Sequence, residues 1–137
     1  MTTVINLKDK KAVEEAKKEG NFIRIDRKTK WGNPFKIGED GNRQEVIELY
    51  IDLCLVNWIL EKDTYLKQLD ELKGKILGCW CKPDLCHGDI LGIIAEDWPD
   101  CLNCNTKMKP AFDTVAKKYT KYNWKCNCSP GLFISIG

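Results

Sequence analysis

The sequence has very little histidine and methionine, and it lacks any long apolar run. Among its 137 residues there are one histidine and two methionines. No stretch approaches the roughly 20 apolar residues that a membrane helix needs, and residues 1–10 lack the apolar centre of a secretory signal. We therefore expect a cytoplasmic protein without membrane association, in a compartment that keeps its thiols reduced.

Cysteine, in contrast, is abundant. The chain has eight cysteines, and in a reducing compartment such a number favours metal ligands or reactive thiols over disulfides. Three of them, Cys79, Cys81 and Cys86, lie in one short stretch with the single histidine, His87. An apolar run at 76–78 precedes this stretch, and a helix-like apolar run starts at residue 90. The stretch is therefore predicted to be a turn between a strand end and a helix start, where α/β sheets bind their ligands.

Positive charge is confined to the two ends of the chain. Residues 1–36 carry a net charge of +5, residues 37–100 carry −8 and residues 101–137 carry +5, although the whole chain carries only +2. An acidic middle segment argues against the class of proteins that coat nucleic acid uniformly. It permits nucleic-acid contact through the ends, and solvated lysine faces are the alternative.

The periodicity of residues 1–98 predicts an α/β domain, a small open sheet with flanking helices. Strands are expected at 4–7, 22–27 and 76–78, and helices at 9–18, 44–60 and 63–72 and after residue 90. The apolar residues of 44–60 nearly encircle that helix, so it should be mostly buried. The Trp-Pro-Asp sequence at 98–100 marks the domain boundary.

Two close cysteine pairs lie beyond this boundary. Cys101 and Cys104 are followed, after 21 intervening residues, by Cys126 and Cys128. Four thiolates from two short loops form a closed, tetrahedral Zn²⁺ site. We therefore predict that residues 99–137 form a C-terminal zinc ribbon with one structural zinc ion per chain, with strands at 119–125 and 131–136. The second pair has one spacer residue, where two are usual.

The same segment combines lysines with aromatic side chains. Lysines can pair with phosphates, and aromatic rings can stack on unpaired bases. Weak binding of single-stranded nucleic acid is therefore one prediction for the ribbon, and a lysine-covered structural lid is the other. The residues concerned are Lys107, Lys109, Lys117, Lys118, Lys121, Lys125, Phe112, Tyr119, Tyr122 and Trp124.

The turn at 79–87 permits three interpretations. In the first, a thiol is a nucleophile, with His87 and Asp89 as acid–base partners. In the second, the three cysteines and His87 bind a second metal ion. In the third, the cysteines pack and the backbone binds an anion. For the first interpretation we expect Cys86 to be the most acidic thiol, because a helix begins after it, and Asp89 to orient His87.

Three motifs together resemble the family known as domain of unknown function 4326. They are Lys-Trp-Gly-Asn-Pro-Phe at 30–35, Gly-Lys-Ile-Leu-Gly-Cys-Trp-Cys-Lys-Pro at 74–83 and Cys-His-Gly-Asp-Ile-Leu at 86–91. The resemblance covers roughly residues 4–97. The family is common in phages and bacteria, and for a phage protein the compartment would be the host cytoplasm. The resemblance implies a compact α/β domain whose pocket lies between the Trp-Gly-Asn-Pro loop and the Cys-His turn.

From these observations we predict an enzyme that acts on a nucleotide or a nucleic-acid base, by glycosidic cleavage or base modification. The alternative is a non-catalytic nucleotide- or nucleic-acid-binding protein, phage-encoded in origin. Trp31 would stack on the base, Asn33 would read its edge and an arginine would hold a phosphate. The expected binding residues are Arg24, Arg27, Trp31, Gly32 and Asn33, and the expected catalytic residues are Cys81, Cys86, His87 and Asp89.

Overall fold

The computed structural model describes residues 2–126, 128 and 133–135. Its first three elements are β1 (Thr3–Asn6), α1 (Lys10–Glu19) and β2 (Phe22–Arg24). Helix α1 begins where the Asp9 side chain accepts a hydrogen bond from the amide of Ala12. It ends where Gly20 adopts a φ of 76°, a conformation that glycine tolerates best. These elements confirm the expected order, although β2 ends earlier than predicted.

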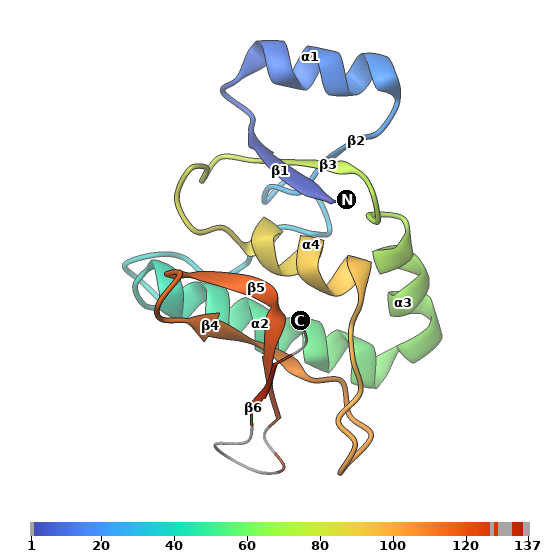
Figure 1. Ribbon diagram of the computed structural model, residues 1–137. Coiled ribbons are helices and arrows are strands. Elements are labelled where there is room, and N and C mark those ends of the chain that lie inside the picture. The colour runs from blue at the N-terminus through green and yellow to red at the C-terminus, as the bar shows by residue number, and fades with distance from the viewer. Residues whose placement is uncertain (1, 127, 129–132, 136–137) are drawn as a thin grey trace.

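The central strand of the N-terminal sheet comes last in sequence. Strand β3 (Ile76–Cys79) pairs in parallel with β1 on one side and with β2 on the other, giving the order β1-β3-β2. Gly78 is needed in this strand because a β-carbon there would lie 2.7 Å from side-chain atoms of both Leu7 and Phe22. Figure 1 shows α1 on one face of this sheet and α4 on the other.

Helix α4 (His87–Glu96) packs its apolar side against the sheet. It begins at His87, directly after Cys86, because Cys86 and Asp89 form a capping box. The Cys86 sulfur accepts from the amide of Gly88, and the Asp89 carboxylate accepts from the amide of Cys86. Ile90 and Leu91 are fully buried. Gly88 lets the helix approach closely, since a β-carbon there would lie 2.7 Å from Ile25 Cδ1.

Two further helices form the layer behind α4 and beside it. Helix α2 (Arg43–Leu60) begins with a capping box of Asn42 and Glu45, and α3 (Lys62–Asp70) follows it directly. The prediction that α2 is mostly buried holds for one side of the helix, where buried residues extend from Val46 to Trp58, whereas Val56 and Ile59 are exposed. Its strongest contacts, with α3, α4 and β4, leave the last turn uncovered, so Leu60 is 74% exposed.

The C-terminal part is an antiparallel sheet that lies against α2 and α4. It contains β4 (Lys109–Asp113), β5 (Lys118–Lys125) and β6 (Phe133–Ser135), in that order. Strand β4 was not expected, because its second residue is Pro110 and its apolar pattern is short. The predicted strand at 131–136 is confirmed at 133–135, and residues 131, 132 and 136 lie outside the described residues.

A continuous hydrophobic cluster joins the two sheets. Trp98, Met108 and Trp124 belong to the same buried cluster as Leu77 and Ile90. The predicted class, a small α/β sheet with flanking helices followed by a cysteine-bearing ribbon, is confirmed. Within the described ranges, no helix is both long enough and apolar enough to span a membrane.

Candidate functional site

The carboxyl ends of the parallel strands β2 and β3 open into a cavity of about 340 Å³. This volume is at the lower end of the range for small-molecule sites. Its lining residues come from the end of β2, the loop after it, the start of α2 and the turn after β3. They are Asp26, Arg27, Lys28, Asn33, Phe35, Ile37, Arg43, Val46, Ile47, Cys79, Trp80, Cys81, Leu85 and His87.

The turn after β3 is held in place from both sides. Asn6, at the end of β1, donates its side-chain amide to the carbonyl of Lys82 at 2.6 Å. Arg43, from the first turn of α2, donates to the carbonyl of Leu85 at 3.1 Å. The residues of the turn are therefore positioned by two elements that are distant in sequence.

Three thiols gather at this turn. The sulfur atoms of Cys79, Cys81 and Cys86 all lie within 4.8 Å of one another. Cys79 ends β3, Cys81 lies in the turn and Cys86 caps α4, where its sulfur accepts a hydrogen bond from the amide of Gly88 at 3.3 Å. The structure thus brings together the cysteines that the sequence singles out.

The acidity of these thiols differs from the expectation. Hydrogen bonds from Cys79 and then Cys86, together with Arg43, lower the pKa of Cys81 to about 2. The same contacts, with Cys86 as donor to Cys79 and Cys81, raise the pKa of Cys86. The prediction that Cys86 is the most acidic thiol is therefore wrong, because Cys86 is buried and donates, whereas Cys81 accepts beside a cation.

His87 is oriented by the backbone and not by Asp89. Its Nε2 lies 2.8 Å from the carbonyl oxygen of Ile25, so Nε2 carries the proton and donates. Its Nδ1 faces the Cys86 sulfur at 3.6 Å, and burial lowers the pKa of His87. Asp89 instead accepts from the amide of Cys86 at 3.1 Å and pairs with Lys82. The expectation that Asp89 orients His87 is therefore corrected.

The Trp-Gly-Asn-Pro loop supports the site mainly through its packing. Trp31 is 6% exposed. Together with residues of α2 and α3 it lines a separate cavity of about 260 Å³, so it does not face the cavity with the thiols. Gly32 is required, because a β-carbon would lie 2.5 Å from the α-carbon of Arg27. Asn33 lines the thiol cavity, but its amide donates to Val46 and accepts from Phe35.

The two predicted arginines have different positions. Arg27 lines the cavity, and its guanidinium donates to the carbonyl oxygens of Asn33 and Phe35. Arg24 instead forms an ion pair with Asp26 at 2.7 Å, and its guanidinium lies 6.0 Å from the centre of the Trp80 ring. Arg24 therefore does not line the cavity, but it contacts Asp26 and Trp80, which do.

The sequence reasoning missed most of the lining residues, among them Trp80, Asp26 and Arg43. Trp80 is 50% exposed on the cavity wall, and its indole N–H donates to Asp26 Oδ2 at 3.1 Å. The other carboxylate oxygen of Asp26 is buried without a hydrogen-bond partner among the described residues. Arg43 reaches the turn from α2. The Cys-Trp-Cys alternation did not point to Trp80, because neighbouring residues of a strand face opposite sides and Trp80 would then lie away from the thiols.

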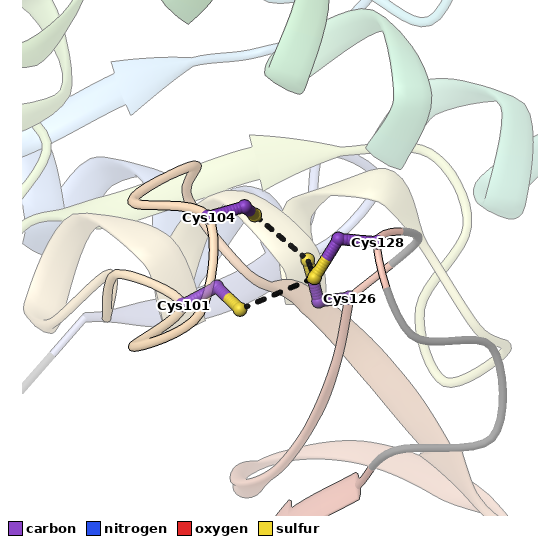
Figure 2. A group of neighbouring side chains, drawn as sticks. All are labelled: Cys101, Cys104, Cys126 and Cys128. Atoms are coloured by element: carbon purple, nitrogen blue, oxygen red, sulfur yellow. Dashed lines mark hydrogen bonds between the residues drawn. The ribbon is translucent and has the colours of Figure 1, made fainter.

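The four C-terminal cysteines converge from two loops, as Figure 2 shows. The sulfurs of Cys101 and Cys128 are 3.6 Å apart, and those of Cys104 and Cys126 are 3.4 Å apart. Thr106 lowers the pKa of Cys104 to about 6 through hydrogen bonds to its sulfur, which favours the thiolate form that binds metal. These four residues form a group that could hold a metal ion.

Half of the ribbon lysines are engaged in ion pairs. Lys107, Lys109 and Lys125 pair with Asp100, Asp52 and Glu48 at 3.0, 2.8 and 3.0 Å. Lys117, Lys118 and Lys121 are exposed at or near the tip of the β4–β5 hairpin. Only these three therefore offer an exposed basic surface to a phosphate backbone.

Comparison with known proteins gives the family and no function. The model of the family described as domain of unknown function 4326 matches residues 5–97, so the chain belongs to this family. An uncharacterised 12.4 kDa protein of Enterobacteria phage T4, from the nrdA-td intergenic region, is 40% identical over 75 residues, which cover 54% of this chain and 67% of the relative. An uncharacterised protein of Acanthamoeba polyphaga mimivirus is 34% identical over 71 residues, 46% of this chain and 50% of the relative. No solved structure matches.

Proposed function

We propose that the protein binds a nucleotide, or one unpaired base of a nucleic acid, in the cavity at the carboxyl end of the parallel sheet. The observation that carries this proposal is the half-exposed indole of Trp80, which lines the cavity together with Arg27, Lys28 and Arg43. An exposed tryptophan offers a face on which a base stacks. The cations beside it suit a phosphate.

Asp26 holds the indole of Trp80 in place on the cavity wall. Its oxygen Oδ2 accepts from Arg24 at 2.7 Å and from the indole N–H of Trp80 at 3.1 Å. The ring is therefore oriented before a base stacks on it.

The thiols at the cavity wall are the chemically reactive part of the site. Cys79 and Cys81 line the cavity that would hold the ligand. In this proposal the protein is an enzyme that acts on the base or on its glycosidic bond. Trp31 and Asn33 act only through the packing of the loop.

The second candidate is a binding protein without catalysis. The observation that favours it is that His87 and Asp89, the expected acid–base pair, both make structural hydrogen bonds, to Ile25 and Cys86 respectively. Both candidates need the cavity to be occupied. They differ in turnover: removal of the thiols abolishes turnover in the enzyme, whereas the binding protein has no turnover and tolerates loss of the thiols.

Binding is tested by calorimetry with the four 5′-nucleoside monophosphates, followed by chromatography of each incubated nucleotide. We expect one base class to bind, with affinity reduced at least tenfold by Trp80→Ala. Tyr122→Ala is the control, because Tyr122 is also an exposed aromatic residue but lies on β5. Binding of none of the four nucleotides, or equal binding by Trp80→Ala, would refute the proposal.

We also propose that the metal held by Cys101, Cys104, Cys126 and Cys128 is one structural zinc ion. Four thiolates in a closed tetrahedron select zinc, with bonds of about 2.3 Å. Elemental analysis of the purified protein should show a zinc ion that is lost in Cys126→Ser/Cys128→Ser. Retention of all zinc in this variant would contradict the assignment.

A further inference from the structure

We propose that Cys79, Cys81 and Cys86 hold a second zinc ion, whose fourth coordination position faces the cavity. The three sulfurs lie within 4.8 Å of one another, and none of these cysteines belongs to the C-terminal group. The proposal deepens the proposed function, because the metal would lie in the wall of the nucleotide cavity. Metal binding itself does not depend on the identity of the ligand.

The backbone fixes the three sulfurs before any metal binds. Cys79 and Cys81 are two residues apart at an extended strand end, so their side chains lie on the same side. Cys86 is held by the capping box, in which Asp89 accepts from the Cys86 amide at 3.1 Å. A site assembled from a strand, a turn and a helix cap needs little reorganisation to bind an ion.

The distances suit a metal bound by thiolates. Tetrahedral zinc with bonds of about 2.3 Å places two sulfurs about 3.8 Å apart. The sulfurs of Cys79 and Cys86 are 2.7 Å apart, so these two must separate by about 1 Å around the ion. Soft sulfur ligands favour zinc over magnesium or calcium, which take oxygen ligands.

The fourth position is open because the sulfur group borders the cavity. Cys79 and Cys81 line it, and Cys86 lies behind them, 1% exposed. Structural zinc sites have four protein ligands, whereas catalytic sites have three and keep one position for water or substrate. The arrangement therefore corresponds to the catalytic type, with Trp80 positioned to hold a base beside the metal.

The surroundings are those of a metal site. His87 donates Nε2–H to the carbonyl of Ile25 and turns Nδ1 to the Cys86 sulfur. Such a bond from one ring nitrogen to a backbone carbonyl is typical of histidines that ligate a metal through the other nitrogen, and here it turns an unprotonated Nδ1 toward the sulfur group. Three thiolates and Zn²⁺ leave one net negative charge, and the guanidinium of Arg43 interacts with Cys81 to offset it.

The test is the zinc content of the full-length protein, purified under reducing conditions and dialysed. We expect two zinc ions in the wild type and one in Cys81→Ser, the least buried of the three positions. Cys54→Ser is the matched control, since Cys54 is a buried cysteine of α2 outside both groups, and it should keep two. One zinc in the wild type, with one also in Cys81→Ser, would overturn the proposal.

A second measurement covers the case in which Cys81→Ser does not fold. Titration of the wild type with a thiol-blocking mercurial should release the second zinc ion only as Cys79, Cys81 and Cys86 are blocked, which peptide mass spectrometry identifies. Release of all zinc when only the C-terminal cysteines are blocked would overturn the proposal. So would a disulfide between Cys79 and Cys86 in the reduced preparation.

The two proposals fail separately. Two zinc ions without nucleotide binding would retain the metal site and refute the proposed function. Nucleotide binding that depends on Trp80, in a protein with one zinc ion, would retain the proposed function and refute the second metal site.

Discussion

The phenolic hydroxyl of Tyr119 in β5 donates a hydrogen bond to the carboxylate of Glu48 in α2. The ammonium group of Lys125, also in β5, binds the same carboxylate at 3.0 Å. Tyr119 is 5% exposed and belongs to the hydrophobic cluster that joins the two sheets. One acidic residue of the N-terminal part therefore anchors two residues of the ribbon.

Tyr119→Phe should lower the free energy of unfolding by about 1 to 2 kcal/mol, because it removes the hydrogen bond to one oxygen of the Glu48 carboxylate and leaves Lys125 on the other. Urea unfolding followed by tryptophan fluorescence and by circular dichroism measures the effect. The two probes should give one shared transition, since the ribbon and the α/β part have a common core. Tyr122→Phe, at an exposed position of the same strand, should change stability little. Equal stability of both variants would show that the Glu48 contact contributes nothing.

The two glycines of α4 should respond to alanine in opposite ways. At Gly88 a β-carbon would lie 2.7 Å from Ile25 and 3.1 Å from Val4, so Gly88→Ala should destabilise the fold by about 1 to 3 kcal/mol. At Gly92 the nearest atoms are 3.7 Å away, so Gly92→Ala should stabilise it by up to about 1 kcal/mol through helix propensity. Thermal unfolding of both variants tests the close approach of α4 to the sheet, which the same sign in both would contradict.

Asp26 should make stability depend on pH in the acid range. The hydrogen bond from Arg24, assisted by Trp80, holds the pKa of Asp26 below its ordinary value. A lowered pKa means that the folded state favours the ionised form. The resulting stabilisation is present above the unfolded pKa of about 3.9 and is lost as the pH falls through the lower, folded pKa.

Asp26→Asn should therefore cost about 1 to 2 kcal/mol at pH 7, and the difference from wild type should shrink below pH 4. Urea unfolding at several pH values measures this difference. Loss of a metal ion from the C-terminal cysteines at low pH would affect both proteins alike and would cancel in the comparison. Asp70→Asn, at an exposed carboxylate at the end of α3, is the control. A difference that stays constant to pH 2.5 would contradict the lowered pKa.

The ribbon should bind single-stranded nucleic acid only weakly. The exposed lysines of the ribbon are Lys117, Lys118 and Lys121. Three phosphate contacts on a single strand give a slope of log affinity against log salt of about −2. Fluorescence titration at several salt concentrations, with the triple Lys→Glu variant as comparison, measures this slope. Binding that is insensitive to salt or to the triple variant would exclude the lysine surface.

The sequence was sufficient to predict what depends on local pattern. The helix at 44–60 follows from its apolar periodicity, and the cysteine pairs at 101–104 and 126–128 follow from spacing. The place of the thiol turn at a strand end also follows, because a parallel strand and a helix flank it. These features involve residues that are close along the chain.

Contacts between distant residues were not predictable in the same way. The burial of Trp31 depends on α3, and its separation from the thiol cavity cannot be read from the motif. Arg43 donates to the carbonyl of Leu85, which is 42 residues away in the sequence. Trp80 donates to Asp26, which is 54 residues away. The lowered pKa of Cys81 depends on hydrogen bonds from Cys79 and Cys86 and on Arg43, which the fold brings to it from a strand, a helix cap and α2.

The position of β3 in the middle of its sheet determines when this sheet can form. Thr3 and Phe22 both pair with Ile76, so β1 and β2 have no neighbour in their sheet until Ile76–Cys79 has been synthesised. During translation, residues 1–75 therefore precede the only strand with which β1 and β2 pair in this sheet of the described residues. Pairing over such separations is slow, and α4, which covers the sheet, follows β3 directly along the chain.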